Sequence, residues 1–416
     1  MEEYDKLQKA SDELPHDMED MGKHYVYQYR NFKSFWAILK SDSFWVTNAR
    51  FCNDIEEQRF GAHVLDVVWR DTDNPDTNEN TPYEELDENY IACFCKENNK
   101  LSQWRGYAPE GGCSIGFDFN MANHYRIISE KKEVEQIAQL CSVLYLPPQG
   151  SLSDKEYVDI CVEHMTQRTP GKGMVKTEDA RKERNRRAPF IKHADFSEED
   201  EYRLVFKNER KKLDHLIHYK QAENPAIQIP YIVVKAGQKH REKQNCVVRI
   251  VLCDKCAAEA LIKELCKKLP QTQIHICNAT YGQPGNVDAT FCNGCGIRRW
   301  LGGKKVNDEC RFQGCSYNAY GLAENENCVM ISQGKDEERI YKVVHACVEK
   351  INQKYYSNND PVKVWCEGHL PIRSIMVGPC ENQSSVKESI RQYCKHTYWL
   401  QDVVIETSTT PFRKSI

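Results

Sequence analysis

Two glutamates lie two residues apart in the segment FSEEDEYRLVF, which covers residues 196–206. Glu199 and Glu201 precede or begin an apolar strand, and alternate residues of a strand point to one face, so we expect both carboxylates on that face. Neighbouring carboxylates raise each other's proton affinity unless a cation or hydroxyl group accompanies them. The pair therefore predicts either a functional site or a solvated strand start with Arg203 as counter-ion, and spacing alone favours the second.

A single arginine stands where the periodicity of the segment YVYQYRNFKSFWAILKSDSFWVTN changes. In this segment, residues 25–48, the first tyrosines alternate with other residues, which is the period of a strand. Apolar residues then follow at helical spacing from Phe32 to Leu39, and FWVT has the composition of a second strand. We therefore expect a strand, a helix and a strand, with Arg30 at the end of the first strand. Arg30 is either a surface charge or a guanidinium held in place by this apolar packing.

Acidic side chains also offer the oxygen ligands that hard divalent cations prefer. Asn53, Asp54 and Glu56 lie in a predicted loop after the second strand. With Asp118 and the glutamate pair, they would surround the metal ion of a phosphodiesterase or nuclease. We rank this alternative lower because no lysine lies at a close spacing from the acids, and because Asn53 and Asp54 are suited to cap a helix that begins at Ile55.

Most of the 20 cysteines lie at or after Cys246, so the carboxy-terminal part has a different character. The motifs FCNGCG and ECRFQGC supply two pairs of thiols that suit a tetrahedral structural zinc ion, with the ligands Cys292, Cys295, Cys310 and Cys315. Cys253 and Cys256 form a competing pair, and buried free thiols are an equal alternative. Nothing in the sequence places a histidine beside a cysteine, which disfavours a Cys-His hydrolase.

The composition of the chain indicates its cellular compartment and excludes some classes of binding partner. Lys and Arg number 57 against 61 Asp and Glu, so the formal charge of −4 excludes a globally basic nucleic-acid binder, and any site for a polyanion must be a local patch. No apolar run is long enough to span a membrane, and the amino terminus is acidic where a secretory signal would be basic and then apolar. We therefore expect a cytoplasmic protein without a membrane partner, whose cysteines are reduced.

The elements that must position these residues are predicted from local patterns. YIACFCK (90–96) and CSIGFDF (113–119) have strand patterns and flank LSQWRGYAPEGG, a helical turn closed by glycines. VEQIAQLCSVLYL (134–146) has helical spacing. The basic run KTEDARKERNRRAPFIK (176–192) predicts a helix with a solvated face.

Two late segments, 249–281 and 373–407, share the order strand, turn, helix, strand, and indicate either a duplicated unit in one sheet system or two ordinary βαβ segments. We expect four regions along the chain. They are a polar leader at 1–22, an α+β core domain at 23–285, a Cys-rich segment that is a candidate zinc site at 286–360, and the second repeated unit, packed on the core, at 361–416.

The ordered motifs FWVTNARFCNDIEE, SQWRGYAPEGGCSIGFD, SEEDEYRLVF and IRSIMVGP resemble an uncharacterised bacterial family, domain of unknown function 2971. The resemblance covers residues 24–255 and resumes at 372–413. This family label implies no activity.

The layout is also similar to the ADP-ribosyltransferase fold, which implies a mixed, mainly antiparallel sheet core with helices. By this resemblance Arg30 occupies the first motif, Tyr107 or Trp104 supplies the aromatic platform, and Glu201 is the catalytic glutamate, with Glu199 completing an E-x-E pair. Asn53 joins Arg30 and the aromatic residues as a cofactor-binding candidate. The chain departs from the family layout because it has no Ser-Thr-Ser segment.

The resemblance implies an enzyme that cleaves the bond between nicotinamide and ribose in NAD. A carboxylate such as that of Glu201 would stabilise the positive charge that develops on the ribose. Arg30 would bind ribose or phosphate, and an aromatic face would stack on nicotinamide. The expected activity is ADP-ribosyl transfer to a protein or nucleic acid, or hydrolysis of NAD, in a defence or toxin effector. Two alternatives stay open: the metal-dependent phosphodiesterase or nuclease, and a binding module without catalysis.

Overall fold

The computed structural model describes residues 25–51, 60–62, 64, 88–119, 124–129, 132–138, 140–147, 188–222, 224–237, 246–252, 255–269, 273–278, 299–301, 304–306, 327–332, 336–356, 362–366 and 368–411. The predicted leader at 1–22, Asn53 with its acidic neighbours, and the zinc candidates Cys292, Cys295, Cys310 and Cys315 lie outside the described residues. The zinc site therefore stays a prediction.

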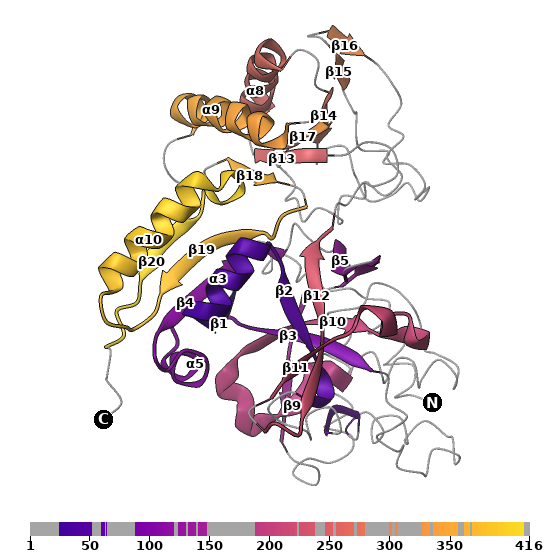
Figure 1. The fold of residues 1–416 in the computed structure, drawn as a ribbon. Helices are drawn as coiled ribbons and strands as arrows, with labels where there is room; N and C mark the ends of the chain where they lie inside the picture. The colour runs from indigo at the N-terminus through magenta and orange to yellow at the C-terminus, as the bar shows by residue number, and fades with distance from the viewer. Residues whose placement is uncertain are drawn as a thin grey trace, which may run out of the picture.

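The larger of the sheets is mixed but mainly antiparallel, which confirms the expected α+β class (Figure 1). Its twelve described strands include the path β20-β19-β4-β1-β3-β2-β12-β5-β6, with β10 paired to β3, β7 paired to β10, and β11 paired to β12. Only β19 and β20 pair in parallel among the described strands of this sheet. Its strands are β1 (Val26–Asn31), β2 (Phe44–Asn48), β3 (Asn89–Cys95), β4 (Gly112–Phe117), β5 (His124–Ile128), β6 (Glu133–Ile137), β7 (Leu140–Ser142), β10 (Glu201–Lys207), β11 (His218–Gln221), β12 (Gln228–Ala236), β19 (Ile372–Val377) and β20 (Val404–Thr407).

Strand β3 pairs with three other described strands of the large sheet, one along one edge and two along the other. Strand β10 pairs with it from Cys95 to Asn89. On the other edge β2 pairs with β3 at one end and β1 pairs with it at the other, through Tyr27 and Cys95. Between these contacts the Gln28 amide donates a hydrogen bond to the Cys93 carbonyl oxygen at 3.4 Å. This side chain therefore satisfies a backbone acceptor where β1 and β2 diverge.

Helix α3 (Phe32–Ser41) joins β1 to β2, as the periodicity predicts. The Asn31 side chain caps its first turn by accepting a hydrogen bond from the Ser34 N–H at 2.9 Å, and Asp42 ends it in a left-handed conformation. Helix α3 and helix α10 (Gln383–His396) contribute buried residues to one aromatic and aliphatic core of the large sheet.

Helix α5 (Leu101–Tyr107) packs against a smaller apolar group that includes Tyr29, Cys95 and Met376. Because side chains alternate along a strand, this group lies on the face of β1 and β3 opposite to Val26 and Phe94 of the main core.

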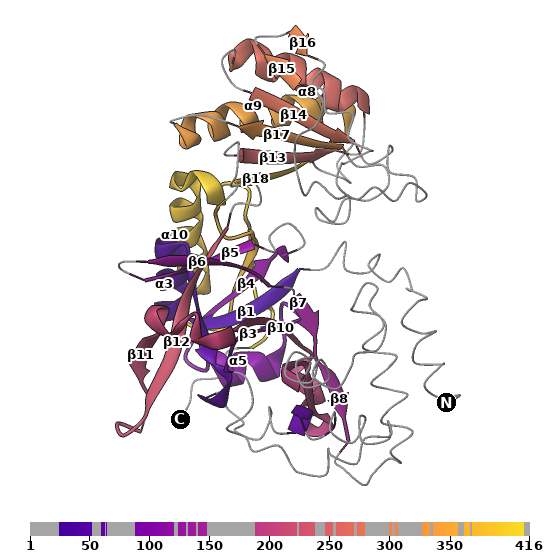
Figure 2. The ribbon, with the colours of Figure 1, turned by 90° about the vertical axis from the view of Figure 1, so that its right-hand side faces the viewer.

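A second sheet has the order β16-β15-β14-β17-β13-β18 and packs with two helices around a separate core. Figure 2 shows this part above the large sheet. Its elements are β13 (Cys246–Leu252), α8 (Lys255–Lys268), β14 (Gln273–Asn278), β15 (Arg299–Leu301), β16 (Lys304–Val306), β17 (Asn327–Ser332), α9 (Glu337–Tyr355) and β18 (Lys363–Cys366).

The two late segments have the expected element order, but not the expected sheet. The first is β13–α8–β14 and the second is β19–α10–β20. Strands β13 and β14 both pair with β17 in the small sheet, whereas β19 and β20 pair with each other in the large sheet. The prediction that both units share one sheet system is therefore wrong.

The helix predicted for 134–146 is also wrong, because the described residues of this segment form β6, β7 and β8 (Leu144–Leu146). Apolar residues three apart satisfy a helical pattern, but β6 pairs with β5, β7 with β10, and β8 with β9 (Ile191–His193). Partners distant in sequence thus override the local pattern.

Short 3₁₀ helices complete the described elements: η1 (Ala49–Phe51), η5 (Ala188–Phe190), η6 (Ala194–Glu199), η7 (Glu209–Lys211), η8 (Asp214–Leu216) and η11 (Tyr398–Leu400). In the part of the chain that the structure describes, no helix has the length and apolar character needed to cross a membrane.

Candidate functional site

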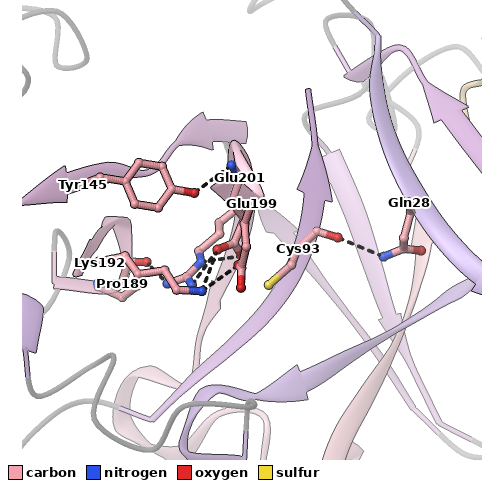
Figure 3. A network of polar contacts seen from close by, with 8 residues as sticks. Gln28, Cys93, Tyr145, Pro189, Lys192, Glu199 and Glu201 are labelled. Carbon is pink, nitrogen blue, oxygen red and sulfur yellow. Dashed lines mark hydrogen bonds and ion pairs between the residues drawn. The ribbon is translucent and has the colours of Figure 1, made fainter. Parts of the chain in front are cut away.

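Glu201 begins β10 and is held by a two-pronged ion pair (Figure 3). Arg203, two residues along the same strand, donates from Nε to Oε1 and from Nη2 to Oε2, both at 2.8 Å. Its third nitrogen donates to the Pro189 carbonyl oxygen at 2.7 Å. Both charged side chains are buried, with 5% of the Glu201 side chain and 2% of the Arg203 side chain exposed. The counter-ion proposed from sequence is thus present, but it pairs with Glu201 inside the protein and not at a solvated strand start.

Lys192 on β9 joins the two glutamates. Its buried ammonium group donates to Glu199 Oε2 at 2.7 Å and lies 3.6 Å from Glu201 Oε2. Glu199 ends η6, Asp200 adopts a left-handed conformation with φ 45°, and only then does the strand begin. The two carboxylates therefore converge on one cation because the chain turns at Asp200, and not because both glutamates belong to one strand.

The Glu201 carboxylate is stabilised in its ionised form. Burial alone would raise its pKa, but the charge and hydrogen bonds of Arg203, the charge of Lys192 and a hydrogen bond from Cys93 outweigh burial and hold the pKa below its usual value. The Glu201 backbone N–H donates to the Tyr145 hydroxyl oxygen at 2.9 Å. Glu199 differs because 32% of its side chain is exposed.

Tyr107 connects this charged group to Arg30. Burial raises the pKa of Tyr107, as do the charges of Cys93, Glu199 and Glu201, while Lys192 lowers it. Burial lowers the pKa of Arg30, and the ionised forms of Cys93 and Tyr107 oppose this effect. Tyr107 and Cys93 therefore lie between Arg30 and the glutamates, since both act on the pKa of Arg30 whereas neither Glu199 nor Glu201 does. Tyr107 is 39% exposed, so its ring is accessible.

Trp104, the other aromatic candidate, is a packing residue. It is buried, its ring meets the Tyr29 ring edge to face at 4.6 Å, and its Nε1–H donates to Asn99 Oδ1 at 2.9 Å. A ring enclosed in this way has no free face for a ligand. Of the two aromatic candidates, only Tyr107 has an exposed ring on which a ligand could stack.

Asp118, a candidate for the alternative metal site, has a different environment from the glutamates. It is buried, and its charge acts on Tyr25 and Arg373. Within the described ranges no group of three or more His, Cys, Asp or Glu side chains could hold a metal ion.

Sequence patterns missed Lys192, Cys93 and Tyr145. Lys192 ends the basic run that predicted a solvated helix, yet it is a buried residue of β9. The flanking apolar residues Phe190 and Ile191 were a signal that the run ends in the protein interior. Tyr145 lies in the segment wrongly assigned as a helix.

Residues 103–204 match the family model described as "Protein of unknown function (DUF2971)". The DUF2971 match runs from within α5 to Leu204 of β10 and so includes Tyr107, Lys192, Glu199 and Glu201, while Arg30 lies before it. Neither the curated proteins nor the solved structures include one that matches this chain.

Proposed function

We propose that this chain binds NAD and cleaves the bond between nicotinamide and ribose, on a core that resembles ADP-ribosyltransferases. In this reaction the bonding electrons leave with nicotinamide, and a nucleophile of an acceptor macromolecule or water attacks the ribose carbon and loses its proton. The observation that supports the proposal best is that Tyr107 interacts electrostatically both with Arg30 and with the glutamate pair, which come from separate segments.

The geometry favours different roles for the two glutamates. Both oxygens of Glu201 accept hydrogen bonds from the Arg203 fork, so its carboxylate is a positioning group that holds Lys192 and the turn. Glu199 is the more exposed carboxylate and is oriented by Lys192. In the proposed mechanism Glu199 accepts a hydrogen bond from a ribose hydroxyl group and stabilises the cationic transition state. Asn53, predicted to contact NAD, lies outside the described residues.

The remaining groups would bind the substrate. The accessible ring of Tyr107 offers a stacking surface for nicotinamide, and the guanidinium of Arg30 offers a permanent positive charge for phosphate or ribose. Burial lowers the pKa of Arg30, which shows that its guanidinium is partly removed from water. Away from water, the attraction between this guanidinium and a phosphate is stronger.

One observation favours a second candidate, a binding module without catalysis. The cluster pairs two buried cations with two carboxylates, and such pairing also occurs in purely structural ion networks. In this alternative the network fixes β9 and η6 against β10, and NAD is not a substrate.

Incubation of the full chain with NAD distinguishes the two candidates. The enzyme proposal predicts release of free nicotinamide that grows with protein concentration and time. A radiolabelled adenylate moiety that becomes attached to an added protein or RNA extract indicates transfer, and free ADP-ribose indicates hydrolysis. Absence of nicotinamide release across a range of acceptors, together with absence of NAD binding by calorimetry, would favour the binding module.

A further inference from the structure

A second surface, away from the glutamate cluster, is formed by β2, β12 and β11, which lie side by side (Figure 1). The registers place Trp45 opposite Val233, Thr47 opposite Tyr231, and Tyr231 opposite His218. These five side chains therefore share one face. The intervening residues of β2 and β12, such as Val46 and Ile232, point into the main core and are fully buried. The shared face is consequently the outer side of the sheet.

Three rings on this outer face form a column, which we call the aromatic column: Trp45, Tyr231 and His218. The Trp45 and Tyr231 rings stack at 4.4 Å with planes 28° apart, and Tyr231 stacks on His218 at 5.4 Å and 27°. Trp45 is 48% exposed, which is unusual for so large an apolar side chain. Cross-strand stacking alone explains the order of the rings, but not the exposure of the indole.

Cations border the aromatic column. The Lys220 ammonium lies 5.9 Å from the centre of the Trp45 ring. Lys235 lies on β12 itself, on the same outer face, and its register partner Arg126 lies on the neighbouring strand β5. On β6, Glu135 lies opposite Arg126 and Glu133 opposite Ile128, and Glu133 pairs with Arg126 at 3.8 Å. Lys220 and Lys235 therefore border the rings, while Glu133 and Glu135 offset the charge of Arg126 on the far side of β5.

We propose that this face binds single-stranded nucleic acid. Exposed aromatic rings stack on unpaired bases, and neighbouring lysines and arginines attract phosphates, so the two features together fit this polymer. The overall charge of −4 makes a local basic patch necessary for any such binding. A duplex, whose base faces are covered by neighbouring pairs, offers the rings nothing to stack on. This inference is independent of NAD cleavage.

The test measures fluorescence anisotropy of a fluorescein-labelled oligothymidylate of about 20 nucleotides, longer than a typical single-domain site. The full chain should bind it at low salt, and the corresponding duplex should bind much more weakly. Trp45→Ala should weaken binding about tenfold or more, because one base–ring stack is lost. Leu101→Ala, which truncates an equally exposed apolar side chain on α5, should leave the affinity unchanged.

If Trp45→Ala disturbs the sheet, variants of the neighbouring lysines still test the proposal, through the salt dependence of binding. Lys220→Gln with Lys235→Gln should lower the slope of log affinity against log salt by about two, while Lys350→Gln on α9 should not change it. Lack of binding at protein concentrations up to about 100 µM, the weak limit of non-specific binding, would overturn the proposal. Equal binding of the duplex, or the same affinity and salt slope in all variants, would overturn it as well.

Discussion

At the scale of single residues, Glu199 and Glu201 differ by their surroundings more than by their chemistry. Glu201 is enclosed by the Arg203 fork and Lys192, whereas Glu199 shares Lys192 and is partly exposed. A carboxylate that is already paired inside the protein contributes to folding, and an exposed one is able to meet a substrate.

The first prediction concerns Glu201→Gln, which keeps the shape of the side chain and removes its charge. Arg203 and Lys192 would lose their buried partner, so we expect the free energy of unfolding to fall by about 3–5 kcal/mol. The lowered pKa of Glu201 sets the pH range of this loss. The contribution is present above the ordinary carboxyl pKa and disappears as the pH falls through the lowered native value.

Denaturant unfolding at neutral pH and near pH 3 checks this expectation. The difference between Glu201→Gln and the unmodified chain should be large at neutral pH and smaller in acid. Equal midpoints at neutral pH would show that the ion pair contributes nothing measurable to folding.

At the scale of elements, the turn that follows Tyr107 is fixed by the close approach of the start of β4 to β1. A β-carbon added to Gly112 would lie 2.1 Å from the Arg30 carbonyl oxygen and 2.9 Å from the Ala108 side chain. Such distances force backbone displacement. Gly106, within α5, has no neighbour inside 4 Å of an added β-carbon.

These two glycines give a matched pair for the second prediction. Gly112→Ala should lower the unfolding free energy by about 2 kcal/mol or more, because a backbone oxygen must move. Gly106→Ala should raise it by up to about 1 kcal/mol, because alanine favours the helix and meets nothing. Thermal or denaturant unfolding measures both values, and a Gly112→Ala variant as stable as Gly106→Ala would contradict the close packing of the start of β4 against β1.

Local patterns were sufficient for some elements and not for others. The segment from Tyr25 to Asn48 formed the expected strand, helix and strand because its period changes sharply and Asn31 caps the helix. The strands of 134–146 could not be recognised because their pairing partners are far away in the sequence. Lys192 was missed for the same reason, since only the fold buries it beside the glutamates. Arg30, Tyr107 and the glutamate pair were named as candidates through the resemblance to the ADP-ribosyltransferase layout, and their roles stay a prediction, while the closed Arg203 fork required coordinates.

At the scale of the whole molecule, side chains link the small sheet's helix α9 to the carboxy-terminal unit of the large sheet. Asp402 accepts hydrogen bonds from the Tyr341 hydroxyl group at 2.6 Å and pairs with His345 at 2.6 Å. The hydrogen bond that His345 donates to the Asp402 carboxylate raises the pKa of His345 above its usual value. Burial would raise the pKa of Asp402, but His345 and Tyr341 lower it overall.

The third prediction is a pH-dependent link between these two parts. The ion pair requires His345 protonated, so its contribution is present below the usual histidine pKa and disappears as the pH rises through the raised native value. At the acid end it disappears as the pH falls through the lowered pKa of Asp402. We expect Asp402→Asn to cost about 1 kcal/mol near pH 6, a value reduced by partial exposure, and less near pH 9.

Unfolding curves of Asp402→Asn at the two pH values check this expectation, with Glu406→Gln, an exposed carboxylate on β20, as a control for the general effect of removing a negative charge from this unit. A cost for Asp402→Asn that does not change with pH would mean that the Tyr341 hydrogen bond, and not the ion pair, makes the link.

The central claim is that an accessible carboxylate of the glutamate cluster promotes cleavage of NAD. The most direct measurement compares nicotinamide release by Glu199→Gln and by Glu198→Gln, its exposed neighbour in η6. Both variants remove one negative charge from the same turn, and unfolding curves confirm that both remain folded. We predict that Glu199→Gln lowers turnover about 100-fold or more while Glu198→Gln retains it. Equal turnover in the two variants, or no release of nicotinamide by the unmodified chain, would contradict the account.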